Sequence, residues 1–117
     1  MVTNQAGIAR GYYDVAAVEE LHAWMQQDLA KIGAHIDDIE FCPHHPEGSI
    51  PDLTTACECR KPNPGMLEKL QQRWRPDLSR SFMLGDSDKD AAAGAALGIH
   101  SLKIAPGSIM QEINRLI

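Results

Sequence analysis

The sequence predicts an α/β domain built on a mainly parallel, Rossmann-like sheet with flanking helices. Short apolar runs of the kind found in buried strands alternate with stretches whose apolar residues recur every three or four positions, as they do in helices. This alternation favours parallel strands joined by right-handed crossovers. The 117 residues are one domain's worth, and no repeat or linker-like run divides them. Residues 1–117 are therefore expected to belong to a single domain.

The first half of the chain is expected to supply two strands and one helix. Met1 and Val2 have the character of a strand's last residues, followed by a polar turn over residues 3–7. A helix is expected from an Asp14 cap to a stop at Gly33, and a strand over residues 36–41. The apolar residues expected to face inward from this helix are Val18, Leu21, Met25, Leu29 and Ile32.

The second half is expected to supply three helices and two strands. Asn63 as a cap and Pro64 at the first helical position predict the start of a helix. Its expected inward residues are Met66, Leu67, Leu70 and Trp74. The other elements are expected at residues 81–84 (strand), 88–97 (helix), 99–104 (strand) and, after a capping box of Ser108 and Gln111, at the end of the chain (helix).

Composition restricts the partners. The formal net charge is −5 and no basic tract is present, which argues against a nucleic acid or an anionic membrane surface as partner. No apolar run approaches the roughly twenty residues that cross a bilayer. The three cysteines are an odd number and no secretory signal precedes the domain, so the cytoplasm is expected and a disulfide framework is the weaker interpretation.

The cysteines and two histidines cluster in one loop over residues 42–59. A Cys-x-His turn and a Cys-x-Cys turn can together hold zinc, which takes four sulfur or nitrogen ligands in structural sites. The predicted ligands are Cys42, His44, Cys57 and Cys59. His44 is preferred to His45 because its one-residue gap from Cys42 mirrors the gap between the other two cysteines. With four protein ligands the zinc would be structural, and it would hold Arg60 and Lys61 in place.

Two further segments carry groups suited to phosphate. Thr3 and Asn4 offer a hydroxyl and an amide at a turn whose backbone N–H groups could hold an oxyanion, although ordinary turn chemistry explains these residues equally well. Arg60 and Lys61 follow the cysteine loop directly. Arginine binds phosphate as a bidentate fork and lysine as a point charge. A solvated surface pair is the alternative.

A third segment, residues 85–90, is rich in carboxylates. Asp86 follows a predicted buried strand and is the better candidate for a magnesium ligand, while Asp88 and Asp90 suit the start of a helix. A calcium loop is rejected, because Ala91 stands where the sixth-position glycine is needed and Leu97 where the twelfth-position glutamate is needed.

Four motifs resemble those of the zinc-containing phosphatases of the haloacid dehalogenase superfamily, in the branch of the heptose 1,7-bisphosphate 7-phosphatases and histidinol phosphatases. They lie in the same order, at residues 2–11, 42–46, 57–66 and 83–90. The resemblance covers the chain from Val2 to about Ile104. It implies a zinc-stabilised α/β phosphatase that needs magnesium and acts on a phosphorylated sugar.

The resemblance also implies a role for each matching residue. Thr3 would hydrogen-bond the transferring phosphoryl group and Lys61 would neutralise its charge, while Arg60 would help to recognise the substrate. Asp86 would bind magnesium, in line with its position after a strand. The full set of substrate-binding residues implied is Thr3, Asn4, Gln5, Ala6, Arg60 and Lys61, and the zinc ligands are Cys42, His44, Cys57 and Cys59.

One part of the family pattern has no counterpart. Such phosphatases attack phosphorus with the first aspartate of an Asp-x-Asp motif at the end of their first strand and use the second as acid and base. This chain matches the family from the end of the second strand, so the first strand and its nucleophile are expected to be missing. The 117 residues would then be a partial domain, inactive alone. Asp86 and Asp88 also form an Asp-x-Asp, but at the position of the magnesium ligands.

The resulting functional hypothesis is removal of the 7-phosphate of a heptose bisphosphate. Histidinol phosphate is the alternative substrate. A non-catalytic, zinc-stabilised phosphate-binding module is the alternative from another functional class, and turnover would distinguish it from an enzyme. The oligomeric state cannot be predicted from the sequence.

Overall fold

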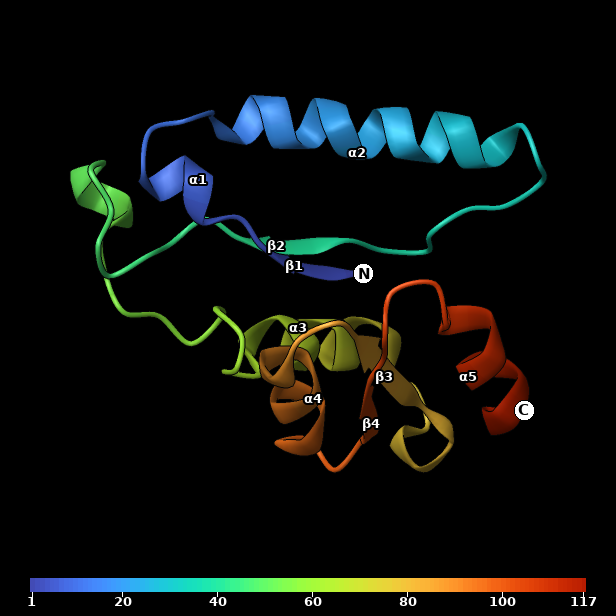
Figure 1. The fold of residues 1–117 in the computed structure, drawn as a ribbon. Helices are drawn as coiled ribbons and strands as arrows, with labels where there is room; N and C mark the ends of the chain where they lie inside the picture. The colour runs from blue at the N-terminus through green and yellow to red at the C-terminus, as the bar shows by residue number, and fades with distance from the viewer. The chain divides into compact units, whose positions relative to one another are not determined.

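The computed structural model describes all of residues 1–117 and divides them into two compact units, Met1–Arg60 and Lys61–Ile117. Each unit contains one pair of parallel strands together with helices (Figure 1). The predicted α/β class with parallel strands is therefore confirmed. No helix combines the length and the apolar character needed to pass through a lipid bilayer.

The first unit pairs two short strands beside a long helix. Its elements are β1 (Val2–Asn4), α1 (Ala6–Ala9), α2 (Val15–Ala30), β2 (Glu40–Cys42) and a 3-10 turn, η1 (Pro51–Leu53). Val2 lies opposite Glu40, and Asn4 opposite Cys42. Figure 1 shows α2 running along the β1–β2 pair, and the contact includes the rings of His22 and Phe41, whose centroids are 6.0 Å apart.

The predicted start of α2 is confirmed, but its predicted inward face is partly wrong. Asp14 caps the helix by accepting from the N–H of Ala17 at 2.9 Å. Val18 is buried as expected, whereas Leu21 is 50% exposed and Ile32, beyond the helix end at Ala30, is 79% exposed. The buried residue on the next turn is His22. The buried face of α2 therefore follows a four-residue step from Val18 to His22. Because His22 is polar, the apolar pattern of the sequence could not identify it as a buried position.

The strand predicted over residues 36–41 and the turn predicted over residues 3–7 also need correction. The strand expected over 36–41 is only Glu40–Cys42, because the side chain of Gln26 takes both backbone groups of Ile36: Nε2 donates to the carbonyl at 2.6 Å and Oε1 accepts from the N–H at 2.9 Å. The polar turn expected over residues 3–7 is not formed. β1 continues to Asn4, and α1 follows almost at once.

The second unit packs helices against a second strand pair. Its elements are α3 (Gly65–Trp74), a 3-10 turn η2 (Leu78–Arg80), β3 (Phe82–Gly85), α4 (Asp88–Ala95), β4 (His100–Lys103) and α5 (Ile109–Leu116). Phe82 lies opposite His100, and Gly85 opposite Lys103. α4 approaches the strands closely at Gly94, where a Cβ atom would lie 2.7 Å from the Cβ of Met83.

The helix starts in this unit were predicted less well than the strands. The N-cap of α3 is Pro64, not Asn63, and the helix begins at Gly65. The Ser108 hydroxyl donates to the Ala105 carbonyl at 2.7 Å and does not cap α5, so the predicted Ser108–Gln111 capping box is wrong. A capping box forms instead at α4, between Ser87 and Asp90.

The predicted core face of α3 is half right. Met66 is fully buried, but Trp74 is 56% exposed because it is the last residue of the helix. Arg75 follows in the left-handed conformation (φ 47°) and ends the helix there.

Candidate metal centre and phosphate-binding residues

Three cysteines and one histidine converge in the first unit. Cys42, the last residue of β2, is buried, and His44 follows two residues later; Cys57 and Cys59 come from the segment after η1. One ligand atom from each of the four lies within 4.8 Å of the others. The structure therefore brings together all four residues that the sequence predicts as zinc ligands.

The distances in this cluster fit a tetrahedral ion. With Zn–S bonds of about 2.3 Å, the sulfur–sulfur edges of a tetrahedron are about 3.8 Å long. The Sγ atoms of Cys42 and Cys57, and those of Cys57 and Cys59, are each 3.4 Å apart. The Nδ1 atom of His44 lies 3.7 Å from the sulfur of Cys42 and 3.3 Å from that of Cys59. The Cys42–Cys59 edge is tighter, at 2.7 Å, yet well beyond a disulfide bond, and all three cysteines are free.

The electrostatics of the three thiols also fit a cation. Burial raises the pKa of Cys42, and burial with the neighbouring sulfurs raises the pKa of Cys59 strongly. The pKa of Cys57 is lowered, because hydrogen bonds from Cys59 and from the N–H of Arg60 outweigh its burial. Three thiolates this close repel one another unless a metal ion compensates their charge.

Backbone hydrogen bonds hold the loop over residues 42–59 against the rest of the first unit. The N–H groups of Ser49 and Ile50 both donate to the carbonyl of Ala9, at 2.7 and 2.9 Å, which ties the loop to the end of α1. The N–H of Arg60 donates to the sulfur of Cys57 at 3.3 Å. The backbone position of Arg60 therefore depends directly on a candidate metal ligand.

Arg60 carries an unusual atom. Its Nη1 is buried and has no hydrogen-bond partner in the protein. A buried guanidinium nitrogen without an acceptor is costly, and an anion supplied by a ligand is one way to satisfy it. The sequence prediction that Arg60 recognises an anionic substrate is consistent with this atom.

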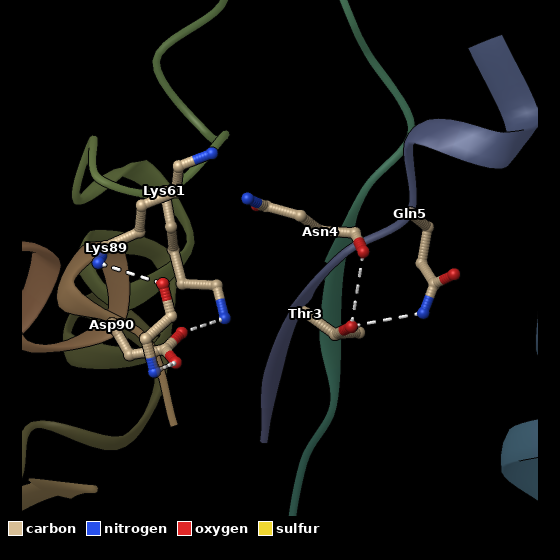
Figure 2. A network of polar contacts seen from close by, with 7 residues as sticks. Thr3, Asn4, Gln5, Lys61, Lys89 and Asp90 are labelled. Atoms are coloured by element: carbon tan, nitrogen blue, oxygen red, sulfur yellow. Dashed lines mark hydrogen bonds and ion pairs between the residues drawn. The ribbon is translucent and has the colours of Figure 1, made fainter. Parts of the chain in front are cut away.

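The side chains at the end of β1 form a small network. Gln5 Nε2 donates to the hydroxyl oxygen of Thr3 at 3.1 Å, and the Tyr13 hydroxyl donates to Gln5 Oε1 at 2.7 Å (Figure 2 shows the Thr3–Gln5 bond). The Thr3 hydroxyl has only a long contact, 3.5 Å, with the Asn4 carbonyl for its own proton. This hydroxyl is thus oriented by Gln5 and can readily donate to a better acceptor. Ala6 begins α1 directly after the network.

In the second unit, Lys61 is held by a carboxylate. Its Nζ lies 2.5 Å from Oδ1 of Asp90, and the side chains of Lys61 and Asp90 are only 12% and 9% exposed (Figure 2). The second carboxylate oxygen of Asp90 accepts from the N–H of Ser87 at 3.1 Å, within the capping box of α4. Because both carboxylate oxygens are engaged, the position of the Lys61 ammonium is well defined.

Asp86 lies shortly before Asp90 in the sequence but in a different environment. It follows the last residue of β3, Gly85, and is exposed. Gly85 is required there, because a Cβ atom would collide with the side chain of Asp90. An exposed carboxylate at the carboxyl end of a parallel strand is free to take a hard cation such as magnesium. Asp88 is exposed as well and lies 3.5 Å from Lys103.

Sequence reasoning missed two residues of these clusters. Asp90 was assigned only to a helix start, and Tyr13 was not considered. The spacing of Ser87 and Asp90 is that of a capping box and could have identified the carboxylate as an ordered one. No sequence signal links Tyr13 to Gln5, eight residues earlier.

Comparison with known proteins gives consistent similarities. Residues 58–115 match the family model described as HAD-hydrolase-like. The chain is 48% identical over 99 residues to the D-glycero-beta-D-manno-heptose-1,7-bisphosphate 7-phosphatase of Rhodopseudomonas palustris, covering 85% of this chain and 55% of that protein. It is 44% identical over 99 residues to the corresponding alpha-anomer phosphatase of Photorhabdus laumondii, covering 85% and 54%. The chain spans about half the length of these curated relatives.

A solved structure agrees with these matches. The D,D-heptose 1,7-bisphosphate phosphatase from B. bronchiseptica, complexed with magnesium and phosphate, superimposes with a TM-score of 0.79 and 34% sequence identity. The match covers 97% of this chain and 60% of that one.

Proposed function

Because this chain belongs to the HAD-like hydrolases, we propose that it supplies phosphate- and metal-binding residues of a magnesium-dependent phosphatase that removes the 7-phosphate of a heptose bisphosphate in the cytoplasm. Residues 1–117 would form part of one catalytic domain. The observation that carries the proposal is the Lys61–Asp90 pair, an ordered and mostly buried ammonium beside a buried carboxylate in the first turn of α4.

Lys61 would neutralise charge on the transferring phosphoryl group. An ammonium fixed before the reaction needs no reorganisation when negative charge develops, and in a partly dry site its interaction is stronger than in water. Asp90 is proposed as the residue that positions it. Removing Asp90 would leave the charge of Lys61 but lose its position.

Thr3 would donate a hydrogen bond to a phosphoryl oxygen. Gln5 occupies a lone pair of the Thr3 hydroxyl, which leaves its proton for an outside acceptor. Asn4, Gln5 and Ala6 would contribute to the same substrate-binding segment. Arg60 would donate a hydrogen bond from its buried Nη1 to an anionic oxygen of the substrate.

Two metals complete the proposal. Asp86 would bind magnesium, which when present neutralises charge on the phosphoryl oxygens. Cys42, His44, Cys57 and Cys59 would bind zinc as a closed structural site with no position for water. The zinc would fix the loop from which Arg60 extends, through the bond of its N–H to Cys57.

The substrate assignment rests on the relatives. Two curated relatives act on heptose bisphosphates of opposite anomeric configuration, and the structural relative carries the same substrate in its name. The proposal is therefore a heptose bisphosphate without a stated anomer. Phosphorylated sugar is the only partner proposed.

Phosphate binding tests the proposal directly. Inorganic phosphate titrated calorimetrically into the zinc-loaded chain with magnesium is expected to bind saturably, and Lys61→Met is expected to abolish this binding. Lys69→Met, on the exposed side of α3, is the matched control and should bind normally. Binding that is identical in the Lys61→Met protein would overturn the proposal.

A further inference from the structure

We infer that Tyr13 is a positioning residue for the Thr3 hydroxyl, which it orients through the side-chain amide of Gln5. The inference rests on the proposed function, in which Thr3 donates a hydrogen bond to a phosphoryl oxygen. It extends that proposal along a chain of two hydrogen bonds, from the Tyr13 hydroxyl to Gln5 and from Gln5 to Thr3. Tyr13 would act on the phosphoryl group only through this chain.

The polypeptide turns back after α1 and brings Tyr13 to the first residues of that helix. The N–H of Tyr12 donates to the carbonyl of Gly7 at 2.9 Å. The ring of Tyr13 lies so close to Gly7 that a Cβ atom on residue 7 would collide with it. Because glycine has no side chain there, the ring fits against α1, and the Tyr13 hydroxyl reaches Oε1 of Gln5 at 2.7 Å.

The direction of the Gln5 amide decides what the Thr3 hydroxyl can do. A primary amide carries two donors on nitrogen and an acceptor on oxygen, so it can present either end to a hydroxyl group. If the amide oxygen faced Thr3, it would take the hydroxyl proton. In the structure the nitrogen faces Thr3, and Nε2 donates to Oγ1 at 3.1 Å (Figure 2). The Thr3 proton then has only a 3.5 Å contact with the Asn4 carbonyl, which a phosphoryl oxygen can replace.

The Tyr13 hydroxyl favours this direction of the amide. A phenolic hydroxyl is a better donor and a poorer acceptor than the aliphatic hydroxyl of Thr3, because the ring withdraws electron density from the oxygen. The amide oxygen of Gln5 therefore pairs with Tyr13, and the amide nitrogen is left for Thr3. Without the phenolic hydroxyl both directions of the amide become available, and one of them consumes the Thr3 proton.

Calorimetric titration of inorganic phosphate into the zinc-loaded chain with magnesium tests the inference. Tyr13→Phe keeps the ring against Gly7 and removes only the hydroxyl, so the variant should stay folded and bind phosphate about fivefold more weakly, the effect of one neutral hydrogen bond. Tyr12→Phe is the matched control, since it removes the hydroxyl of the neighbouring tyrosine, which is 75% exposed, and it should bind with wild-type affinity. Wild-type affinity in Tyr13→Phe would overturn the inference.

A double-mutant cycle with Gln5 distinguishes positioning from packing. Gln5→Met keeps an unbranched side chain of similar length but removes the amide, and it is expected to weaken phosphate binding severalfold. Because Tyr13 acts through that amide, adding Tyr13→Phe to Gln5→Met should cause no further loss. A second fivefold loss in the double variant would show that Tyr13 acts by another route and would overturn the inference. A wild-type chain that binds no phosphate would overturn the proposed function, and the role of Tyr13 with it.

Discussion

Cys42 lies at the centre of the candidate zinc site, buried and within 3.7 Å of the other three ligand residues. Replacing Cys57 and Cys59 together by serine is expected to reduce zinc from one equivalent to none, because two of four ligands are lost and oxygen replaces thiolate. Metal analysis of protein purified without chelator measures this. Full zinc content in the double variant would exclude the site.

The two histidines give a matched comparison for the same site. His44→Ala is expected to release zinc, since its Nδ1 faces the sulfurs, whereas His45→Ala should retain it, since His45 Nδ1 already accepts from the N–H of Glu47. The opposite result would assign the imidazole ligand to His45.

The Lys61–Asp90 pair is the most consequential interaction between two residues. Removal of one partner of a buried pair leaves an uncompensated charge and costs about 3 kcal/mol or more. Asp90→Ala is therefore expected to destabilise the chain by roughly that amount, and the Lys61→Met, Asp90→Ala double variant by less than the sum of the two single changes. Denaturant unfolding of the wild-type chain, the two single variants and the double variant measures these free-energy changes. Additive losses would show that the pair does not contribute to stability, and exposed Asp88→Ala is the control.

At the residue scale the sequence was informative where chemistry limits the choice. Three cysteines and a histidine in one short loop have few interpretations, so the cluster could be predicted, and the structure assembles it. The partner of Lys61 could not be predicted, because Asp90 is 29 residues away in the sequence and its burial depends on the packing of α4. The burial of Nη1 in Arg60 likewise exists only in the folded chain.

At the scale of elements, the close packing of α4 against β3 and β4 depends on one glycine, Gly94. A Cβ atom at Gly94 would lie 2.7 Å from the Cβ of Met83 on β3 and would also collide with Ser101 on β4. Gly94→Ala is therefore expected to destabilise the chain by about 1–3 kcal/mol, although alanine favours a helix by about 1 kcal/mol over glycine. Thermal or denaturant unfolding measures this. Ala95→Gly, at an exposed site in the same helix, should lose only the propensity difference, and a stabilised Gly94→Ala chain would show that α4 can move aside.

Element types were predicted better than their ends. Strand and helix order follows from apolar periodicity, which is local, and the order was correct except for the short helix α1, which was not predicted. The ends depend on which polar side chain satisfies which backbone group. Gln26 takes the backbone groups of Ile36 and shortens the predicted strand, and Ser108 turns back to Ala105 instead of capping α5. A propensity argument cannot distinguish these pairings from the alternatives.

At the scale of the whole molecule, each of the two units has its own parallel pair and its own cluster of functional groups. The first carries the candidate zinc site and the Thr3 network, and the second carries Lys61, Asp90 and Asp86. None of these groups is proposed as the nucleophile. The family's Asp-x-Asp has no counterpart at the corresponding place in the 117 residues.

This assignment predicts the activity of the chain. The 117 residues alone are expected to hydrolyse no phosphate ester with magnesium, because positioning groups without a nucleophile forgo the covalent step. Joining them to an N-terminal segment that carries the family's first strand and its Asp-x-Asp is expected to give turnover of heptose bisphosphate, faster than of histidinol phosphate. Magnesium-dependent turnover by the unextended chain, lost in Asp86→Ala, would make Asp86 or Asp88 a candidate nucleophile instead.

Turnover of that extended protein with and without Lys61 is the most direct measurement of the central claim. Heptose bisphosphate hydrolysis with magnesium should fall by about a hundredfold or more in Lys61→Met, the loss typical of one preorganised electrostatic donor, while Lys69→Met keeps the wild-type rate. A wild-type rate in the folded Lys61→Met protein would contradict the claim that this lysine faces the transferring phosphoryl group.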